Sequence, residues 1–479
     1  MTTKPLSLIA ALTPILFLIG LLTANVLFYG DASLDGANQI ALLLAGTLSA
    51  FIAIGHGHRW NGLFDGVIAS ISTALPALII LLMIGALAGT WMLSGVVPAM
   101  IYYGLDLLNP TIFLFASCLV CSIVSLATGS SWSTVATVGI ALLGIGKALG
   151  LHEGMVAGAI ISGAYFGDKM SPLSDTTNLA PAMAGTDLIT HVKHMMWTTG
   201  PSITISLVLF LILGFTQNSG GDAVAVSALQ DAIASKFTIT PWLFVVPLVV
   251  IALIVKQVPA VPALFAGALL GGLFSVLFQP QILAEVAAVD ASFWQTAYMA
   301  VINAMTTDTA IVTANPLVNE LLQTGGMEGM LGTIWLIICA MTFGGIMEAS
   351  GMLQRITRSI LSVVESTGSL IASTATTCVI FNITASDQYL AIVVPGRMFA
   401  QEYKNRGLAG ENLSRTLEDS GTVTSALVPW NTCGAYNAGV LGVATGTYLP
   451  FAFFNLISPL MTVLFGYMNW KITRLKAEK

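Results

Sequence analysis

The amino-acid sequence predicts an all-α protein that crosses a lipid bilayer many times. Of its 479 residues, 56% are hydrophobic and only 8% are charged, and the mean hydropathy is +0.87. Soluble domains carry about 25% charged residues. Ten apolar stretches approach the length of about 20 residues that a helix needs to cross a bilayer. Between two of them lies a polar, proline-containing segment, residues 167–178, which marks a functional break within the membrane region.

The first apolar stretch is too long for the core of a signal peptide, and no small-x-small cleavage site follows it, so we expect it to be a retained span. Two further apolar regions, 110–150 and 368–402, are divided near the middle by polar clusters. We expect each to form a re-entrant hairpin or a helix broken at its centre. The ten predicted spans are 6–29, 38–55, 74–93, 153–167, 195–215, 241–255, 259–278, 331–349, 412–446 with an interruption, and 448–468.

The basic residues predict the orientation, because Lys and Arg accumulate on cytoplasmic loops. With both divided regions re-entrant, two of the 17 basic residues, Lys147 and Lys236, fall outside, and Lys169 and Arg397 fall within interrupted elements. If both divided regions crossed the membrane fully, the loops between them would change sides, and the basic residues would be distributed less unequally between the two sides. Both termini are therefore predicted to be cytoplasmic, in the cell (plasma) membrane. The thirteen predicted cytoplasmic residues are Lys4, Arg59, Lys193, Lys256, Arg355, Arg358, Lys404, Arg406, Arg415, Lys471, Arg474, Lys476 and Lys479.

Short identities recur in the same order in the two halves of the chain, which predicts an internal repeat. Ser94-Gly95 returns as Ser350-Gly351, 256 residues later, whereas Trp60 returns as Trp294, only 234 residues later. The difference predicts an insertion of about 22 residues near 306–327 in the second half. In the predicted topology, equivalent spans run in opposite directions, which is the inverted repeat typical of secondary transporters.

This repeat divides the chain into five predicted parts. They are an N-terminal span (1–37), a first inverted repeat (38–215), an external linker with a connecting span (216–258), a second inverted repeat (259–468) and a cytoplasmic tail (469–479).

Four polar breaks, two in each half, interrupt the apolar pattern at matching places. Binding sites of inverted-repeat transporters lie near the midplane at such breaks. A hard cation such as Na⁺ takes oxygen ligands from carboxylates, hydroxyls, amides and backbone carbonyls, and free N–H groups at helix N-termini would also accept an anion. We expect one shared site with the ligands Thr128, Ser130, Ser131, Ser174, Asp175, Thr176, Thr177, Asn178, Thr384, Ser386, Asp387, Asn431 and Thr432.

Asp175 and Asp387 are the candidates to bind Na⁺ and a proton in turn. Low dielectric disfavours a charged carboxylate, so a proton and Na⁺ compete for the same oxygens. Mutually exclusive occupancy would give antiport. The alternative is that either residue only caps a half-helix. Asp168 and Lys169 are expected either to neutralise each other or to leave Asp168 as a ligand, and Pro172 is expected to hold the break.

Other functions find little support in the sequence. It has no H-E-x-x-H motif, no Walker A loop and no nucleophile with a base, which argues against an enzyme with a cofactor. Charge is spread too thinly to suggest nucleic acid, and inverted repeats disfavour a channel. The five cysteines are expected to be packing residues. His191 and His194 are expected to lie on a solvated interfacial face.

The segment Gly167-Asp-Lys-Met-Ser-Pro-Leu-Ser-Asp-Thr-Thr-Asn178, preceded by Ser162-Gly-Ala-Tyr-Phe166 and followed by Leu-Ala-Pro181, resembles the signature of the NhaC family of Na⁺/H⁺ antiporters. The resemblance includes Thr128-Gly-Ser-Ser-Trp-Ser-Thr134 and extends loosely along nearly the whole chain. It implies the fold of the ion transporter superfamily, with scaffold and transport subdomains, two re-entrant hairpins, an elevator movement and a homodimer. It also implies exchange of Na⁺ for H⁺ across a prokaryotic cell membrane.

The same family includes members that resemble exchangers of malate and lactate coupled to H⁺ and Na⁺. A small carboxylate substrate is therefore an alternative that the sequence leaves open. Arg397 is the one basic residue in the second divided region that would pair with such a substrate, but an arginine at the cytoplasmic end of a helix is the simpler explanation.

Overall fold

The computed structural model describes residues 5–29, 33, 36–107, 109–216, 223–287, 289, 291–313, 315–361 and 364–475. Over these residues the chain is helical apart from one two-stranded hairpin, β1 (Thr309–Ala310) and β2 (Gln323–Thr324). Lys4, Lys476, Lys479 and residues 217–222 of the predicted linker lie outside the described residues.

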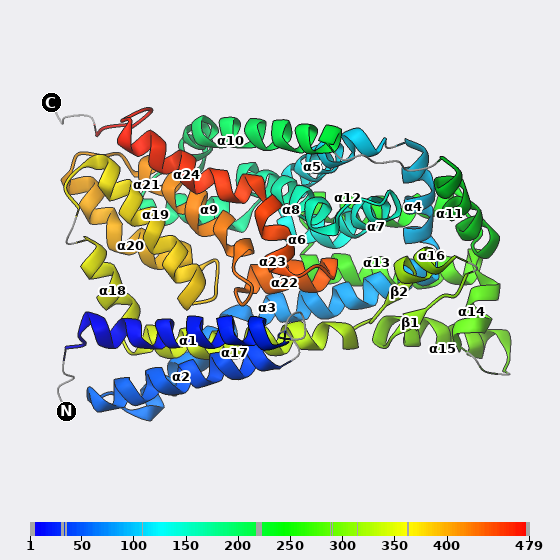
Figure 1. The fold of residues 1–479 in the computed structure, drawn as a ribbon, viewed down its shortest axis with the longest axis horizontal. Coiled ribbons are helices and arrows are strands. Elements are labelled where there is room, and N and C mark those ends of the chain that lie inside the picture. Colours follow the sequence, from blue (N-terminus) through cyan, green and yellow to red (C-terminus); the bar gives the residue numbers. More distant parts are fainter. Residues whose placement is uncertain are drawn as a thin grey trace.

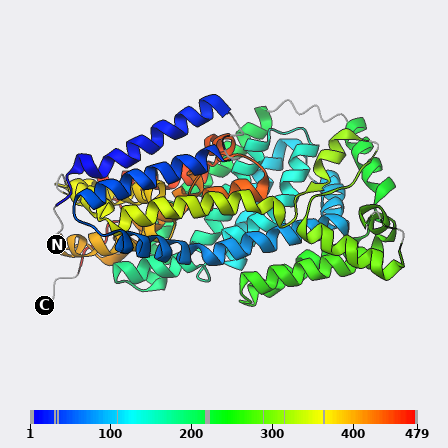
Figure 2. The ribbon, with the colours of Figure 1, turned by 90° about the horizontal axis from the view of Figure 1, so that it is seen from below.

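The helices form two layers (Figure 1). In the first, the α3 layer, α17 packs against both α3 and α2, and α1 packs against α2. Figure 2 shows these four helices running side by side along the molecule. The α3 layer consists of α1 (Leu8–Tyr29), α2 (Ala37–Gly55), α3 (Trp60–Leu93), α13 (Ala260–Phe278), α15 (Phe293–Thr306) and α17 (Leu331–Ala349).

The second layer, the α8 layer, contains the helices that carry the polar breaks. In it α5 packs along α8, and α10 packs against α5 and α24. It consists of α5 (Pro110–Thr128), α6 (Ser131–Thr134), α7 (Ile140–Ala148), α8 (Glu153–Met170), α9 (Asp175–Ala184), α10 (Leu188–Thr216), α19 (Thr367–Thr384), α20 (Leu390–Asn405), α21 (Gly410–Leu417), α22 (Thr432–Leu441), α23 (Thr445–Tyr448) and α24 (Phe453–Tyr467).

The remaining elements connect the layers or lie at their ends. The predicted linker contains a helix, α11, that was not expected from the sequence, and α4, α14 and α18 were not predicted either. These elements are α4 (Val96–Leu107), α11 (Ala223–Lys236), the 3-10 turn η3 (Pro241–Phe244), α12 (Val245–Val255), α14 (Pro280–Ala287), α16 (Pro316–Leu321), the 3-10 turn η4 (Glu328–Met330) and α18 (Met352–Leu361).

The prediction of an all-α, membrane-spanning fold is confirmed. Among the described residues, seven helices are long and apolar enough to cross a bilayer, or nine if two bent helix pairs each form one span. Ten spans were predicted, and α5 (Pro110–Thr128), which was predicted as one limb of a hairpin and not as a span, is among the seven. The regions predicted as spans at 153–167 and 412–446 do not qualify, because α8 ends in polar and charged residues and the second region is divided into short pieces.

The first divided region folds into a hairpin with a sharp tip. Asn109 caps α5 by accepting a hydrogen bond from the Thr111 backbone N–H (2.9 Å), and Ser130 caps α6 in the same way through Ser133 (3.1 Å). Gly129 lies between these helices with φ +72°, a left-handed conformation that glycine adopts without a Cβ penalty. A π-helical turn, Val135–Gly139, joins α6 to α7, which runs back beside α5.

Gly129→Ala tests this tip. We expect a loss of about 1–2 kcal/mol from the left-handed backbone alone, plus a further loss because the new Cβ would approach Leu173 to 2.6 Å. Gly150→Ala is the matched control, since Gly150 has the same φ of +72° and a Cβ added there would meet nothing within 4 Å. Thermal unfolding of both purified variants measures the difference. Equal losses would mean that Leu173 yields without cost.

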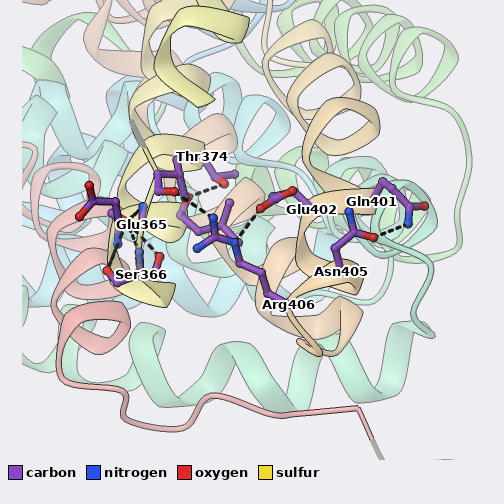
Figure 3. Close-up of polar contacts among 10 residues, drawn as sticks. Glu365, Ser366, Thr374, Gln401, Glu402, Asn405 and Arg406 are labelled. Atoms are coloured by element: carbon purple, nitrogen blue, oxygen red, sulfur yellow. Dashed lines mark hydrogen bonds and ion pairs between the residues drawn. The ribbon is translucent and has the colours of Figure 1, made fainter. Parts of the chain in front are cut away.

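The second divided region also forms a hairpin, from α19 and α20. At its open end, Arg406 Nη2 donates a hydrogen bond to the Val364 carbonyl (2.9 Å) and Nε donates to Glu402 (2.6 Å; Figure 3). The hydroxyls of Thr374 and Tyr403 lie 3.2 Å apart across the two limbs. The first limb, α19, therefore begins at the same end of the molecule at which the second limb, α20, ends.

Two helices are interrupted by proline-containing breaks. α8 ends at Met170, and Pro172, which has no N–H to donate, lies in the turn before α9. The corresponding region of the second half runs from α21 through a π-helical turn, Glu418–Thr422 (η5), and a 3-10 turn, Ser425–Leu427 (η6), to a break at Pro429. Asn431 then caps α22, because its side-chain oxygen accepts the Cys433 backbone N–H (3.0 Å).

Three expectations about individual side chains are settled by burial. All five cysteines are buried, as packing residues should be. The prediction that His191 and His194 are solvated is wrong, since they are only 0% and 8% exposed. The assignment of Arg415 to a cytoplasmic loop is also wrong, because Arg415 lies within α21 and is fully buried.

Candidate functional site

A cavity of about 970 Å³ lies between the two layers. The middle of α3 contributes Thr73 and Ile80 to one wall. The opposite wall is formed by the four polar breaks, each of which supplies at least two residues: 128–130, 172–176, 387–389 and 432–433. The structure therefore brings together the breaks that the repeat predicted to converge.

Eight of the thirteen expected ligands line this cavity. They come from all four breaks and carry carboxylate, hydroxyl or amide oxygens, which are the ligands that a hard cation prefers. They are Thr128, Ser130, Ser174, Asp175, Thr176, Asn178, Asp387 and Thr432.

The other five expected ligands hold the breaks in shape and do not line the cavity. Ser131 donates to Asp168 (2.6 Å), and Thr177 donates to the backbone carbonyls of Asp168 (3.2 Å) and Lys169 (3.0 Å). Thr384 bonds back to the carbonyl one turn earlier in α19, at 2.6 Å. Asn431 donates to the Asn382 carbonyl at 3.1 Å.

Ser386, the fifth, has φ +60°, which is unusual for a residue other than glycine. Its carbonyl accepts the Thr432 backbone N–H (2.9 Å), so it ties the tip of the second hairpin to the start of α22. Such strained residues cost on the order of 1–3 kcal/mol and persist where the surroundings determine them. The hydrogen bond from Thr432 therefore helps to fix the relative position of the two breaks.

Asp175 and Asp387 both line the cavity but differ in their surroundings. Asp175 is exposed there, at the first position of α9, where the helix dipole favours a negative charge. Ser174, not Asp175, occupies the N-cap position. Asp387 is buried, and its Oδ1 accepts the Leu390 backbone N–H (2.9 Å) at the start of α20. Asp387 therefore bonds to the first residue of α20, whose N-cap position is Tyr389, and it also lines the cavity.

Asp168 is a third carboxylate on the cavity wall, where its Oδ2 accepts the Ser131 hydroxyl. The prediction that Asp168 and Lys169 neutralise each other is wrong. The Lys169 ammonium forms an ion pair with Asp419 and donates to Ser458 (3.0 Å). Consecutive residues of a helix project in different directions, so one faces the cavity and the other the interior of the α8 layer.

Several cavity residues were not predicted from the sequence. Gln388, Tyr389 and Cys433 lie beside predicted ligands, but their side chains gave no signal of their own. The turn between α12 and α13, residues 256–259, was predicted as a cytoplasmic loop, yet part of it reaches the cavity. Only tertiary packing places it there.

Aromatic packing shapes the tip of the first hairpin. Trp132, at this tip, lines the cavity. Its ring stacks on Tyr436 of α22 with the centroids 3.9 Å apart, and the Tyr436 hydroxyl donates to the Trp132 carbonyl (2.7 Å). The stack joins the first half of the chain to the second.

The cavity wall carries three carboxylates and, among the described residues, no lysine, arginine or histidine. Arg397, the one basic candidate for a carboxylate substrate, is exposed and lies away from the cavity. No three His, Cys, Asp or Glu side chains of the described chain are grouped closely enough to share a metal ion. The arrangement is suited to a cation held mainly by neutral oxygens.

The chain is similar to several antiporters over most of its length. The chain is 38% identical over 430 residues to the Na⁺/H⁺ antiporter NhaC of Alkalihalophilus pseudofirmus, covering 90% of this chain and 89% of that one. It is 36% identical over 471 residues to the malate-2H⁺/Na⁺-lactate antiporter of Bacillus subtilis (97% of each chain). It is 38% identical over 466 residues to the arginine/ornithine antiporter ArcD of Halobacterium salinarum (96% of this chain, 92% of that one).

Residues 163–470 also match the sequence model of the Na⁺/H⁺ antiporter family. This range includes the polar break at 167–178 and the entire second half of the chain. The resemblance that the segment 167–178 indicated is thereby confirmed. On its sequence and over most of its length, the chain belongs to the Na⁺/H⁺ antiporter family.

Proposed function

We propose that this protein is a secondary transporter that exchanges Na⁺ for H⁺ across the cell membrane. The observation that carries the proposal is the charge of the cavity: Asp168, Asp175 and Asp387 line it without a basic side chain among the described residues. Such a wall attracts a cation. Hydroxyl and amide oxygens from four breaks complete the ligand set that Na⁺ requires. Loss of exchange in the variant Asp175→Asn is the test.

The inverted repeat is part of this proposal. α3 and α17, which the repeat makes equivalent, run antiparallel: Gly66 packs against Ala349 and Gly85 against Gly326. In the second half, α15 and α17 are separated by the segment that contains β1, α16 and β2, where the insertion was predicted. This arrangement favours two halves of opposite orientation, and the two layers would then act as scaffold and moving part in an elevator movement.

The orientation in the membrane is also proposed. The described chain begins at Pro5 and ends at Leu475, and the start of α1 and the end of α24 lie at the same end of the molecule (Figure 1). The Leu6 carbonyl accepts a hydrogen bond from Arg355 (3.0 Å), one of the predicted cytoplasmic basic residues. We infer that this end faces the cytoplasm. A homodimer rests on the family resemblance, and cross-linking in membranes would test it.

Exchange of a small organic anion is the second candidate function. A cavity of about 970 Å³ is far larger than one Na⁺ needs, and the N-termini of α9, α20 and α22 reach it, which favours negative groups of a ligand. The relative from Bacillus subtilis named as a malate/lactate antiporter covers nearly the whole chain.

A substrate swap separates the two functions. In proteoliposomes that contain the purified protein, we expect a Na⁺ gradient to move protons without malate or lactate, because the cavity wall is acidic. Adding either acid inside the vesicles should leave the proton flux unchanged. The measurement is the fluorescence of an internal pH indicator. A proton flux that requires malate or lactate would replace Na⁺/H⁺ exchange by the organic-anion function.

A further inference from the structure

A second cluster of charged groups lies inside the α8 layer, apart from the cavity. Lys169 of α8 pairs with Asp419 of the π-helical turn η5, and Ser458 of α24 bonds to both, at 3.0 Å to Lys169 and 3.1 Å to Asp419. Glu418 precedes Asp419 in the same turn. The side chains of all three charged residues are fully buried, and none of them lines the cavity.

Glu418 is the one of these three charged residues that makes no ion pair or hydrogen bond among the described residues, and Arg415 of α21 adds a second buried positive charge that interacts with Asp419. The Lys169 and Asp419 charges compensate each other, whereas neither carboxyl oxygen of Glu418 has a hydrogen-bond partner among the described residues. Thr422, one turn later, offers its hydroxyl, but the contact falls short of hydrogen-bond geometry. Burying an ionised carboxylate without a partner is so costly that such a group is normally neutralised by a proton.

Glu418 is not the only polar group of this region without a partner among the described residues. Buried polar atoms without a partner also occur in its own turn and in α24, which packs against that turn. Such atoms mark positions where water or an ion completes the hydrogen bonding. A π-helical turn is itself rare and occurs frequently at functional sites. The atoms belong to Asp419, Ser420 and Thr422 of η5 and to Asn455 and Thr462 of α24.

A polar route leads from this cluster toward the predicted cytoplasmic end. His191 of α10 lies within electrostatic range of Lys169, and its Nδ1 is 2.8 Å from the Ser414 hydroxyl of α21. His194 follows one turn away and interacts with Asn412, which bonds to the C-terminal segment through Thr473 (2.6 Å). The Nε2 atoms of both histidines are buried without a partner among the described residues.

We propose that Glu418 is the proton-binding group of the exchanger, in a buried site separate from the Na⁺ cavity and reached from the cytoplasmic end past His194 and His191. The inference rests on the proposed Na⁺/H⁺ exchange and deepens it. Proton binding neutralises Glu418, and when the proton leaves, the Lys169 ammonium is the adjacent positive charge that the carboxylate can approach. The charged groups that act on Glu418 are Lys169 and Asp168 of α8 and Asp419 of its own turn, with His191 of α10 and Arg415 of α21 beside the pair.

The buried charge cluster is connected to the cavity through the end of α8. Asp168, which lines the cavity, and Lys169, which pairs with Asp419, are consecutive residues of α8, and Thr177 of α9 donates to the backbone carbonyls of both. A cation bound beside Asp168 and Asp175 would therefore act on the end of α8 that carries Lys169. Na⁺ and the proton would be coupled through this helix end, without sharing the same oxygens.

The test compares Glu418→Gln with the wild type and with Glu365→Gln, an exposed carboxylate before α19 that serves as the control. Each full-length protein is reconstituted in proteoliposomes. We expect Glu418→Gln to lose Na⁺-driven proton movement and to keep exchange of radioactive Na⁺ for unlabelled Na⁺ at equal pH. Glu365→Gln should keep both. Normal Na⁺-driven proton movement in Glu418→Gln would overturn the inference, as would loss of both modes in a variant that unfolds at the wild-type temperature.

A second measurement does not depend on transport. Infrared difference spectra of the purified protein, recorded between acidic and alkaline pH, report the C=O stretch of a protonated carboxylic acid. Other carboxyl groups contribute bands as well, and we expect one component of the spectrum to be absent in Glu418→Gln and insensitive to Na⁺. A spectrum of Glu418→Gln equal to that of the wild type overturns the inference. A wild-type protein that moves no Na⁺ would contradict the proposed function, and the infrared result would still decide whether Glu418 binds a proton.

Discussion

Asp175→Asn should abolish coupled exchange while leaving the fold intact. Asp175 is exposed in the cavity and lies at the first position of α9, so its carboxylate is free to contact an incoming cation. Asparagine has the same shape without the charge. We expect the Na⁺-driven proton flux in proteoliposomes to fall by at least about tenfold, because a tenfold weaker binding of the cation corresponds to the loss of only about 1.4 kcal/mol.

The stability of this variant should hardly change. Asparagine loses only the favourable interaction of the Asp175 charge with the N-terminus of α9, which is worth about 0.3–1 kcal/mol at an exposed position. Asp231→Asn, an exposed carboxylate on α11, is the matched control and should exchange ions normally. Normal exchange in Asp175→Asn would remove Asp175 from the site, whereas a lowered unfolding temperature would point to a structural role.

Asp387→Asn gives the informative comparison. Asparagine caps helices as well as aspartate does, so the hydrogen bond to Leu390 that starts α20 is retained. Any loss of exchange in this variant therefore comes from the missing charge in the cavity. If exchange is unchanged, Asp387 acts as a cap and Asp175 and Asp168 are the remaining cavity carboxylates.

The second large effect is expected on stability, when the buried ion pair is broken. Lys169→Met leaves Asp419 charged and buried, and removing one partner of a buried pair typically costs about 3–5 kcal/mol. It also removes the hydrogen bond to Ser458. We expect a clearly lower unfolding temperature of the purified variant, in detergent, than of the wild type.

Two further variants identify the cause. Lys147→Met breaks the ion pair with Glu153 (2.9 Å), whose side chains are 35% and 42% exposed, and should cost no more than about 1 kcal/mol. The double variant Lys169→Met, Asp419→Leu should recover much of the lost stability, because apolar groups often replace a buried pair without cost. An unfolding temperature of Lys169→Met equal to that of Lys147→Met would mean that water reaches the pair and solvates Asp419.

Much of the fold could be predicted because its determinants are local. The apolar stretches predicted α1, α2, α13 and α17 nearly to their ends, and the polar clusters marked the tips of both hairpins. α3 is the instructive exception. It begins at Trp60 instead of residue 74. Polar residues in its first turns kept the hydropathy of 60–73 below that of a predicted span, yet this part is helical and buries Leu63 and Val67.

The candidate site could be predicted only as a set of segments. Gly129 and Pro172 mark breaks because of their backbone chemistry, and oxygen-bearing side chains beside them were expected to be ligands. Which of these residues face the cavity depends on the rotation of each half-helix, which neighbouring helices determine. Thr176 lines the wall, whereas Thr177, the next residue, hydrogen-bonds to the end of α8.

Local patterns in the chain establish the membrane class, the family, the breaks and the acidic character of the site, because hydropathy, proline and glycine act over a few residues. The partners of the buried charges depend instead on tertiary packing. Asp168 and Lys169 are neighbours in the chain, yet Lys169 pairs with Asp419, 250 residues away. A charge inside a membrane protein must find its counter-charge wherever packing places one, and packing joins segments that no local pattern connects.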